Sequence, residues 1–375
     1  MTMRDERPAT APAKVLTVNG GSSSLHLVLV DGDREGDRFD LSEGPDTPAA
    51  AEGVRRFLDG RDIPDAVGHR LVHGGDLVDR PMVVDDRLRA GLEELKALAP
   101  LHVPPGLDLL DLLRRLLPDS PHVVCPDSAF HRDLPAAAAT YPLPVAWRRR
   151  WGLRRYGFHG ISYAWSLRRA GMLLGRPVEE LQLVLAHLGG GSSVCAVRHG
   201  RSVDTSMGFT PLDGVPMSTR SGAVDPGMLL WLLDGRLSLA ELTEGLHRRS
   251  GLLGLSADRS NDTRDLVAAC GDDPDAALAL AVFNHRVRRE IAAAASSLDR
   301  LDALVFTGEI GWDQPEVREA VCAGLGQLGV PLPVHGNLDD DGLVGPADAA
   351  VGVLVVQPRE ELEIARQTRA ALCGS

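Results

Sequence analysis

Two stretches of the chain share one pattern of hydrophobic and polar positions. Residues 15–34 (VLTVNGGSSSLHLVLVDGDR) hold two apolar runs separated by glycines and serines, and residues 183–202 (LVLAHLGGGSSVCAVRHGRS) repeat that order. Each stretch predicts a β-hairpin that ends in a charged turn. A side chain that can form hydrogen bonds, Asn19 in one and His187 in the other, stands at the end of the first strand. The repeat indicates a duplicated domain.

The hydrophobic periodicity elsewhere predicts alternating strands and helices. Strands are expected at residues 66–72, 121–125, 301–311 (entering a glycine turn) and 331–334. Residues 350–372 read as a strand and then a charged helix. Further helices are expected at residues 86–98, 105–117, 225–234, 238–246, 274–298 and 314–327. Alternation of this kind is typical of α/β domains.

Length and charge narrow the class of protein. The chain has 375 residues, more than one hydrophobic core usually serves, so two domains are expected. The formal net charge of −12 argues against a nucleic-acid or anionic-membrane surface, which would need a basic face. An anionic ligand must therefore be held by a local cluster of residues.

Cysteine usage and hydropathy bear on the compartment. The five cysteines are far apart and form no CxxC pair, which favours a reduced cytoplasmic protein without a structural zinc. The chain has no apolar stretch of membrane-spanning length and no signal-peptide core near its N-terminus. We therefore expect a cytoplasmic protein with a frayed N-terminal tail.

The two glycine and serine clusters admit two interpretations. Glycines let a backbone approach a phosphate closely, while N–H groups and serine hydroxyls donate hydrogen bonds to it. A single cluster of this kind more often makes only a tight hairpin turn. Because the cluster occurs twice at matching places, phosphate binding is favoured.

Four residues with side chains suited to binding or catalysis stand out along the rest of the chain. Arg70 lies in a short strand that runs into a glycine turn, and Asp127 directly follows another strand. His159 lies in a glycine-broken loop, and Arg220 in the irregular segment 204–226. A planar guanidinium suits carboxylate or phosphate recognition, although Arg70 could instead form a structural salt bridge.

Taken in order, these segments resemble the acetate kinase family, which includes acetate and propionate kinases and is the acetokinase branch of the actin, sugar kinase and Hsp70 superfold. The resemblance covers almost the whole chain. It rests on VNGGSSS, GHRLVHGG, APLH, PDSAFH, RRYGFHG, HLGGGSS, DTSMGFTPLDG, TRSG, DPG, SGLLGLS, LVFTG and EELEIA.

The resemblance implies an α/β fold of two duplicated actin-like (ribonuclease H-like) domains with an interdomain active-site cleft. The first domain would span residues 1–144 plus a C-terminal strand and helix at 355–375. The second, at 145–354, would bind nucleotide and form a homodimer.

The reaction implied is reversible transfer of the γ-phosphoryl group of ATP to acetate or propionate, giving an acyl phosphate and ADP. Arg70 and Arg220 would clamp the carboxylate and the moving phosphoryl group, and His159 would bind its oxygens. Asp127 would orient the attacking group or its arginine. The metal ligands for Mg²⁺ or Mn²⁺ would be Asn19 and Glu360.

The same resemblance implies where the two substrates bind. The acyl group of the small carboxylate would be held beside Arg70 by Val72, Leu101, Phe158 and Pro211. The nucleotide would contact residues of both hairpins and of two later segments. These are Ser22, Ser24, His26, His187, Leu188, Gly189, Gly190, Gly191, Asp262, Thr263, Arg264, Gly308, Glu309, Ile310 and Gly311.

Several residues depart from the family pattern. His26 replaces a lysine, and Gly190 replaces an asparagine. Glu309 stands where a glycine lets adenosine lie against the backbone, and Trp312 and Asp313 replace the glutamate and asparagine that follow. A bulky anion there could obstruct the nucleoside, so alternatives are a kinase with another donor (pyrophosphate or another nucleotide) or another carboxylate. A catalytically silent ligand sensor of the same fold is a third.

Overall fold

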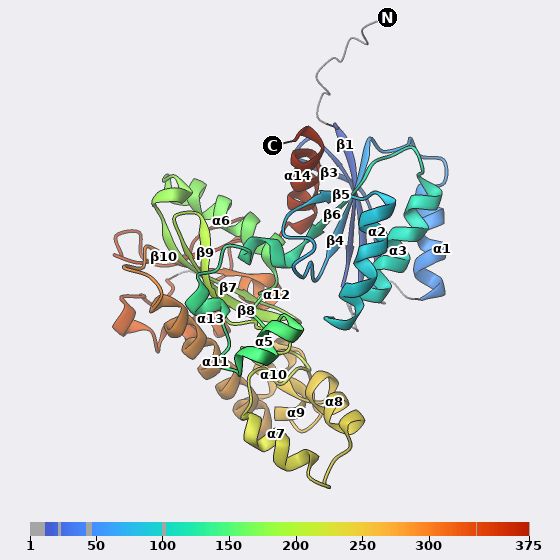
Figure 1. The fold of residues 1–375 in the computed structure, drawn as a ribbon. Helices are drawn as coiled ribbons and strands as arrows, with labels where there is room; N and C mark the ends of the chain where they lie inside the picture. The colour runs from blue at the N-terminus through green and yellow to red at the C-terminus, as the bar shows by residue number, and fades with distance from the viewer. Residues whose placement is uncertain (1–11, 22–23, 43–46, 100–102, 335, 375) are drawn as a thin grey trace, which may run out of the picture. The chain divides into compact units, whose positions relative to one another are not determined.

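The computed structural model describes residues 12–21, 24–42, 47–99, 103–334 and 336–374. The chain divides into two compact units, residues 1–129 with 359–375 (unit 1) and residues 130–358 (unit 2). Each unit contains one six-stranded sheet with helices on both faces (Figure 1). No helix in these described ranges is long and apolar enough to cross a membrane.

The sheet of unit 1 has the strand order β3-β2-β1-β4-β6-β5. β1, β2 and β3 form an antiparallel meander, whereas β4 runs parallel to β1 and β6 parallel to β4. β5 closes the far edge, antiparallel to β6. The strands are β1 (Lys14–Gly20), β2 (Leu25–Asp31), β3 (Arg34–Leu41), β4 (Ala66–Leu71), β5 (Met82–Val83) and β6 (His122–Pro126).

Helices cover both faces of this sheet. One hydrophobic cluster joins β1, β2 and β4 to α1 (Pro48–Leu58) and α3 (Val103–Leu116), and α14 (Glu360–Cys373) packs on the opposite face (Figure 1). Close packing of α14 requires Gly68 in β4, because a Cβ there would collide with the side chains of Thr368 and Ile364. α2 (Asp86–Gly91) and the 3₁₀ helix η1 (Leu92–Ala97) precede α3.

The sheet of unit 2 has the order β11-β12-β10-β7-β8-β9. β7, β8 and β9 form an antiparallel meander, β10 and β12 run parallel to β7, and β11 closes the edge antiparallel to β12. Order and directions therefore match those of unit 1, which confirms the duplication predicted from the two hairpins. The strands are β7 (Gln182–Leu188), β8 (Ser192–Arg198), β9 (Arg201–Thr205), β10 (Ala303–Thr307), β11 (Gly342–Leu343) and β12 (Gly352–Val355).

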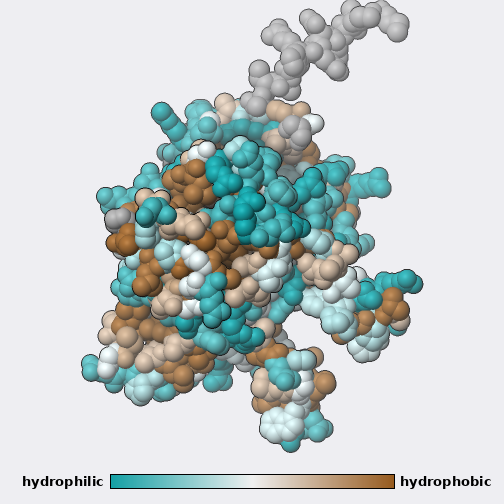
Figure 2. Space-filling model, turned by 90° about the vertical axis from the view of Figure 1, so that its left-hand side faces the viewer, coloured by the Kyte–Doolittle hydropathy of each residue, from teal (hydrophilic) through white to brown (hydrophobic). Residues whose placement is uncertain are grey.

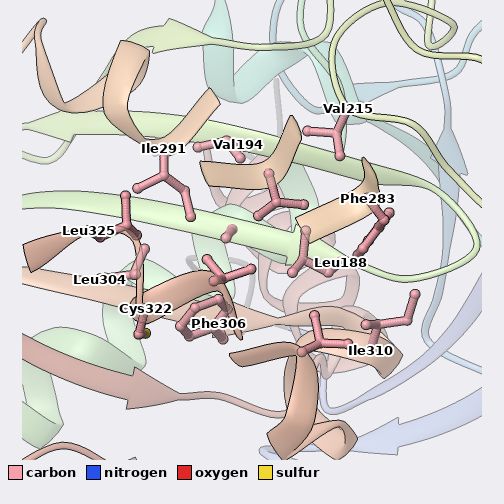
Figure 3. Close-up of a cluster of buried hydrophobic side chains, with 14 of the residues drawn as sticks. Leu188, Val194, Val215, Phe283, Ile291, Leu304, Phe306, Ile310, Cys322 and Leu325 are labelled. Atoms are coloured by element: carbon pink, nitrogen blue, oxygen red, sulfur yellow. The ribbon is translucent and has the colours of Figure 1, made fainter. Parts of the chain in front are cut away.

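Two hydrophobic clusters bury this second sheet. On one face α6 (Gly160–Leu174) packs over it. On the other face lie α11 (Pro274–Ala295) and α13 (Pro315–Cys322), and Figure 3 shows Phe283 and Ile291 pointing toward the sheet that carries Leu304 and Phe306. The remaining helices of unit 2 are α4 (Ala136–Ala139), α5 (Val145–Trp151), α7 (Pro226–Leu233), α8 (Leu239–Arg248), α9 (Gly251–Leu255), α10 (Thr263–Ala269) and α12 (Gly308–Asp313), with the 3₁₀ helices η2 (Asp127–His131), η3 (Val178–Glu180) and η4 (Gly326–Leu328).

Three local predictions were wrong. Residues 331–334 form no strand: Leu332 and Val334 are exposed, and the two prolines of PLPV cannot donate to a sheet. The helix expected at 86–98 divides into α2 and η1. The glycine turn expected after residue 307 is the start of α12.

The boundary between the units also differs from the expected division after residue 144. Residues 130–144 pack with unit 2, where the His131 ring forms hydrogen bonds with Ser202 Oγ (2.8 Å) and the Phe158 carbonyl (3.0 Å). Thr140 forms a β-bridge with Arg154. The return of the C-terminal segment to unit 1 begins at Arg359 in the structure, and the expected strand of that segment, β12, lies in unit 2.

Candidate active site

Arg70 and Asp127 lie together at one edge of the unit 1 sheet. Arg70 is near the carboxyl end of β4 and Asp127 directly follows β6, and the carboxyl ends of parallel strands meet at one edge. Arg70 donates from Nε (3.1 Å) and Nη2 (2.8 Å) to Asp127 Oδ2, and from Nη1 to Asn19 Oδ1 (3.0 Å). The guanidinium is therefore fixed in orientation.

The charge of Arg70 is also fixed. Burial alone would lower its pKa, but the carboxylates of Asp127 and Glu360 outweigh that effect and raise the pKa above its usual value. Arg70 therefore does form a structural salt bridge, the alternative that the sequence allowed for it, and its partner is Asp127. It holds a permanently charged fork of donors at the carboxyl edge of the sheet.

A pair of carboxylates stands beside this arginine, at the start of α14. Asn19 Nδ2 donates to Glu360 Oε2 (2.9 Å) and to Glu361 Oε1 (3.3 Å). Burial, followed by the neighbouring charge of Glu360, raises the pKa of Glu361. Glu361 is a member of this cluster that the sequence reasoning missed, although it adjoins Glu360 in the EELEIA motif.

These oxygens fit a hard divalent cation. Carboxylates are ligands that Mg²⁺ prefers, and Mg²⁺ commonly uses only one or two of them, with water and phosphate completing its shell. Within the part of the chain that the structure describes, no group of three or more His, Cys, Asp or Glu side chains could hold a metal. Since Asn19 Oδ1 accepts from Arg70, Asn19 fits best as the residue that positions Glu360.

The turn between β1 and β2 is held by side chains. His26 Nδ1 forms a 2.6 Å contact with Asp40 Oδ1, and its Nε2 lies 3.1 Å from Ser24 Oγ. His26 thus links the turn to β3. Ser22 and Leu101, which the sequence assigned to the nucleotide and acyl sites, lie outside the described residues.

In unit 2, His159 lies next to the end of β7. Its backbone takes a left-handed conformation (φ 59°), which is uncommon for a residue other than glycine and is often found at functional sites. Its Nδ1 pairs with Ser193 Oγ (2.9 Å), and Ser193 Oγ pairs with the Tyr163 hydroxyl (2.5 Å). The His159 ring stacks on His187, with centroids 4.2 Å apart.

The second glycine turn, Gly189 to Gly191, lies against His159 and Arg220. A Cβ built on Gly191 would be 3.0 Å from His159 Nε2 and 3.8 Å from Arg220 Nη2. Arg220 Nη1 donates to the Pro211 carbonyl (3.0 Å). The structure therefore brings an imidazole, a guanidinium and a bare backbone turn into one place, although they are far apart in sequence.

The acyl-site residues are divided between the units. Val72 is buried in unit 1, whereas Phe158 and Pro211 are buried in unit 2. The Pro211 carbonyl binds Arg220, and Phe158 precedes His159, so both adjoin the unit 2 cluster.

A pocket of about 450 Å³ opens beside the second glycine turn, and all of its lining residues belong to unit 2. It contains six of the residues assigned to the nucleotide, together with others that the sequence reasoning had not assigned to it. The lining is Gly190, Ser218, Asn261, Asp262, Thr263, Arg264, Glu309, Ile310, Trp312, Asp313 and Gln314.

The walls of this pocket have defined structures. Asp262 caps α10 through the Arg264 amide (2.8 Å) and also pairs with the Arg264 side chain (Nη2 to Oδ2, 2.6 Å). Gly308 has φ 78°, and a Cβ there would collide with the backbone of Leu188. The start of α12 is therefore packed directly on the end of β7.

Comparison with known proteins agrees with this arrangement. The model of the Acetokinase family matches residues 56–366. Acetate kinase of Synechococcus sp. is 47% identical over 315 residues (82% of this chain and 77% of that protein), and acetate kinase of Clavibacter michiganensis is 40% identical over 395 residues (96% and 99%).

Solved structures give the same result. The crystal structure of Porphyromonas gingivalis acetate kinase superposes with a TM-score of 0.86 at 32% identity, covering 96% of this chain and 100% of that one. A propionate kinase from Francisella tularensis gives a TM-score of 0.85 at 30% identity, covering 95% and 99%. The chain belongs to the acetokinase family.

Proposed function

We propose that this chain is a short-chain acyl kinase that transfers the γ-phosphoryl group of ATP reversibly to acetate or propionate. The products are an acyl phosphate and ADP. The observation that carries the proposal is the pair of positioned cationic groups, Arg70 in unit 1 and Arg220 beside His159 and Gly191 in unit 2.

The residues match the needs of phosphoryl transfer. Such transfer depends on positioning and on neutralising charge on the moving group, with little covalent chemistry for the protein to do. A carboxylate nucleophile is already ionised at neutral pH and requires no general base. Arg70, oriented by Asp127, would hold the carboxylate, while Arg220 and His159 would hold the oxygens of the phosphoryl group.

The nucleotide would occupy the unit 2 pocket, with its phosphates at the turn from Gly189 to Gly191. Glu360, positioned by Asn19, is the side chain we propose as ligand of Mg²⁺ or Mn²⁺. When bound, the cation supplies neutralisation of the phosphate charge. Val72, Phe158 and Pro211 would surround the acyl chain, and one methylene in such a pocket changes selectivity by only about 1–3 kcal/mol.

We further propose that the protein is a cytoplasmic homodimer whose interface includes α7. This helix has no buried residue, and its Leu230 and Trp231 side chains are 70% and 56% exposed. Figure 2 shows apolar side chains in several patches among hydrophilic ones on the face that it draws. A second copy would remove such apolar surface from water. Leu230→Glu should then shift sedimentation from dimer toward monomer.

The activity is tested with the purified chain by trapping the acyl phosphate with hydroxylamine. Acetate and propionate are each supplied with ATP, GTP or pyrophosphate, with Mg²⁺ or with a chelator. We expect hydroxamate with ATP and Mg²⁺ and a loss of product with the chelator. If hydroxamate formed with pyrophosphate and not with ATP, the proposed donor would be wrong. If no hydroxamate formed with any of the three donors, the proposed kinase function would be wrong.

A further inference from the structure

The unit 2 pocket contains three carboxylates, and two of them are engaged within the protein. Asp262 caps α10 and pairs with Arg264, and Asp313 Oδ1 accepts from Asn337 Nδ2 at 3.3 Å. The third, Glu309, is exposed, and its carboxylate makes no hydrogen bond or ion pair within the described part of the chain. Its acceptor oxygens are therefore available to a ligand.

Glu309 acts on the protein only at longer range. The Arg264 pKa is raised first by its hydrogen bond with Asp262, and the field of Glu309 is among the weakest of its causes. The carboxylate of Glu309 is therefore not needed to hold Arg264. Its place in the pocket lining calls for another role.

The position of Glu309 identifies the part of a nucleotide that it would meet. Its backbone N lies 3.5 Å from a Cβ built on Gly189, so the residue begins directly beside the turn proposed for the phosphates. Because two methylene groups carry the Glu309 carboxylate away from its backbone, we place it at the group that follows the phosphates. In a nucleoside triphosphate this group is the ribose, and the base lies farther away.

The chemistry of the carboxylate selects among possible contacts. An ionised carboxylate only accepts hydrogen bonds, so the ligand group must be a donor. Phosphate oxygens are acceptors and are repelled. The ribose 2′ and 3′ hydroxyls are donors, and carboxylates hold ribose hydroxyls in other nucleotide-binding folds.

We propose that Glu309 accepts hydrogen bonds from the ribose hydroxyls of the nucleotide and so selects ribonucleotides over 2′-deoxyribonucleotides. The inference rests on the proposed function for the identity of the nucleotide. It is the opposite of the expectation from sequence that Glu309 obstructs the nucleoside. It also gives a positive role to a side chain that the resemblance alone leaves unexplained.

The kinetic test compares ATP, 2′-deoxy-ATP and GTP as donors for acetate. In the unchanged chain, kcat/KM should favour ATP over 2′-deoxy-ATP by about tenfold. Glu309→Ala, which removes the acceptor oxygens, should reduce that preference to within about twofold and leave the ratio of GTP to ATP unchanged, because the base is not read by this side chain. Glu316→Ala is the matched control, since Glu316 is an exposed glutamate on the neighbouring α13 outside the pocket lining.

A calorimetric titration with ADP and 2′-deoxy-ADP measures the same preference without acyl transfer. Equal affinity for the two in the unchanged chain, or an undiminished preference in Glu309→Ala, would overturn the inference. So would tighter ADP binding by Glu309→Gly, which would show obstruction. If no donor yields hydroxamate but the ADP preference is present and depends on Glu309, the kinase function fails and the ribose contact stands.

Discussion

The two units share a scaffold and differ in what they hold at equivalent places. Asn19 and His187 are both the last residue but one of the central strand of their sheets, β1 and β7. Asn19 contacts the carboxylates of Glu360 and Glu361 and the Arg70 guanidinium. His187 contacts Ser162 and stacks on His159. Duplication thus fixed the position of the sites, whereas the chemistry at each position diverged.

The turns differ in the same way. Next to the first turn, His26 links Ser24, just before β2, to Asp40 of β3. The β7–β8 turn carries no side chain at Gly191, where a Cβ would lie 3.0 Å from His159 Nε2. A turn without side chains lets backbone N–H groups approach a large anion, which is the arrangement that phosphate requires.

The largest expected effect comes from removing either cationic group. Arg70→Ala and Arg220→Ala should each lower turnover by about a hundred- to a thousandfold, the loss typical of a lost donor to a transition-state oxygen. The hydroxamate assay measures this, with circular dichroism to show an intact fold. Arg248→Ala, at an exposed arginine of α8, is the control. Near-full activity of one variant would show that the arginine it lacks does not stabilise the transferred group.

The next effect is on stability and concerns a histidine buried in unit 2. Burial lowers the His131 pKa to about 4, despite its hydrogen bond to the Phe158 carbonyl. The unfolded chain binds this proton near the usual pKa of about 6.5, so the free energy of unfolding should fall as the pH drops from 6.5 to 4, by up to about 3 kcal/mol.

Hydrogen exchange measured at pH 7 and at pH 5 reports the stability of each unit separately. His131→Asn should flatten the pH dependence of unit 2. Unit 1 should keep its own dependence, since burial also lowers the pKa values of His69 and His122 there. An unchanged pH dependence of unit 2 in the variant would show that other groups set it.

A third prediction compares two glycines of unit 2. Gly308→Ala should destabilise the chain by about 2 kcal/mol and raise the KM for ATP, because its positive φ and the Leu188 backbone both oppose a side chain. Gly190→Asn, which introduces the residue usual in the family, should change both quantities little, since nothing lies within 4 Å of a Cβ there. Thermal unfolding measures the stability and initial rates measure the KM for ATP. Equal effects of Gly308→Ala and Gly190→Asn would contradict the prediction.

The smallest effect distinguishes the two strand ends. Asn19→Ala should raise the Mg²⁺ concentration for half-maximal activity about tenfold, the usual cost of losing a partner that orients a metal ligand. His187→Ala should leave that concentration within about twofold and weaken nucleotide binding instead. A Mg²⁺ titration of both variants is the measurement. The opposite outcome would assign the cation to unit 2.

The sequence predicted the parts of the fold whose periodicity is strong. Both hairpins, α3 and α11 occur where the apolar pattern indicated. The pattern missed α6, which begins at Gly160, because its buried face includes small polar residues such as Ser162 and Ser166 that weaken the hydrophobic period. It wrongly predicted a strand at 331–334, where prolines interrupt an apolar run.

The sequence motifs predicted which residues belong to the candidate site, but not which residues contact one another there. Arg70, Asp127 and His159 stand in motifs whose residue types indicate their chemistry. Their contacts come from elements that meet only in space: Asn19 and Glu360 are 341 positions apart. Spacing along the chain carries no signal for such a contact, so the pairing of Asn19 with Glu360 and Glu361 is known only from the structure.

The return of α14 to unit 1 has a consequence for biosynthesis. Unit 2 is translated between the sheet of unit 1 and the helix that covers it, so β1 and β4 leave the ribosome long before their partner. Until α14 arrives, Val15, Val28 and Ala66 have no cover on that face, and Arg70 lacks the carboxylate of Glu360. The cationic site of unit 1 is thus completed only after unit 2 has been made, which delays activity until both halves of the enzyme exist.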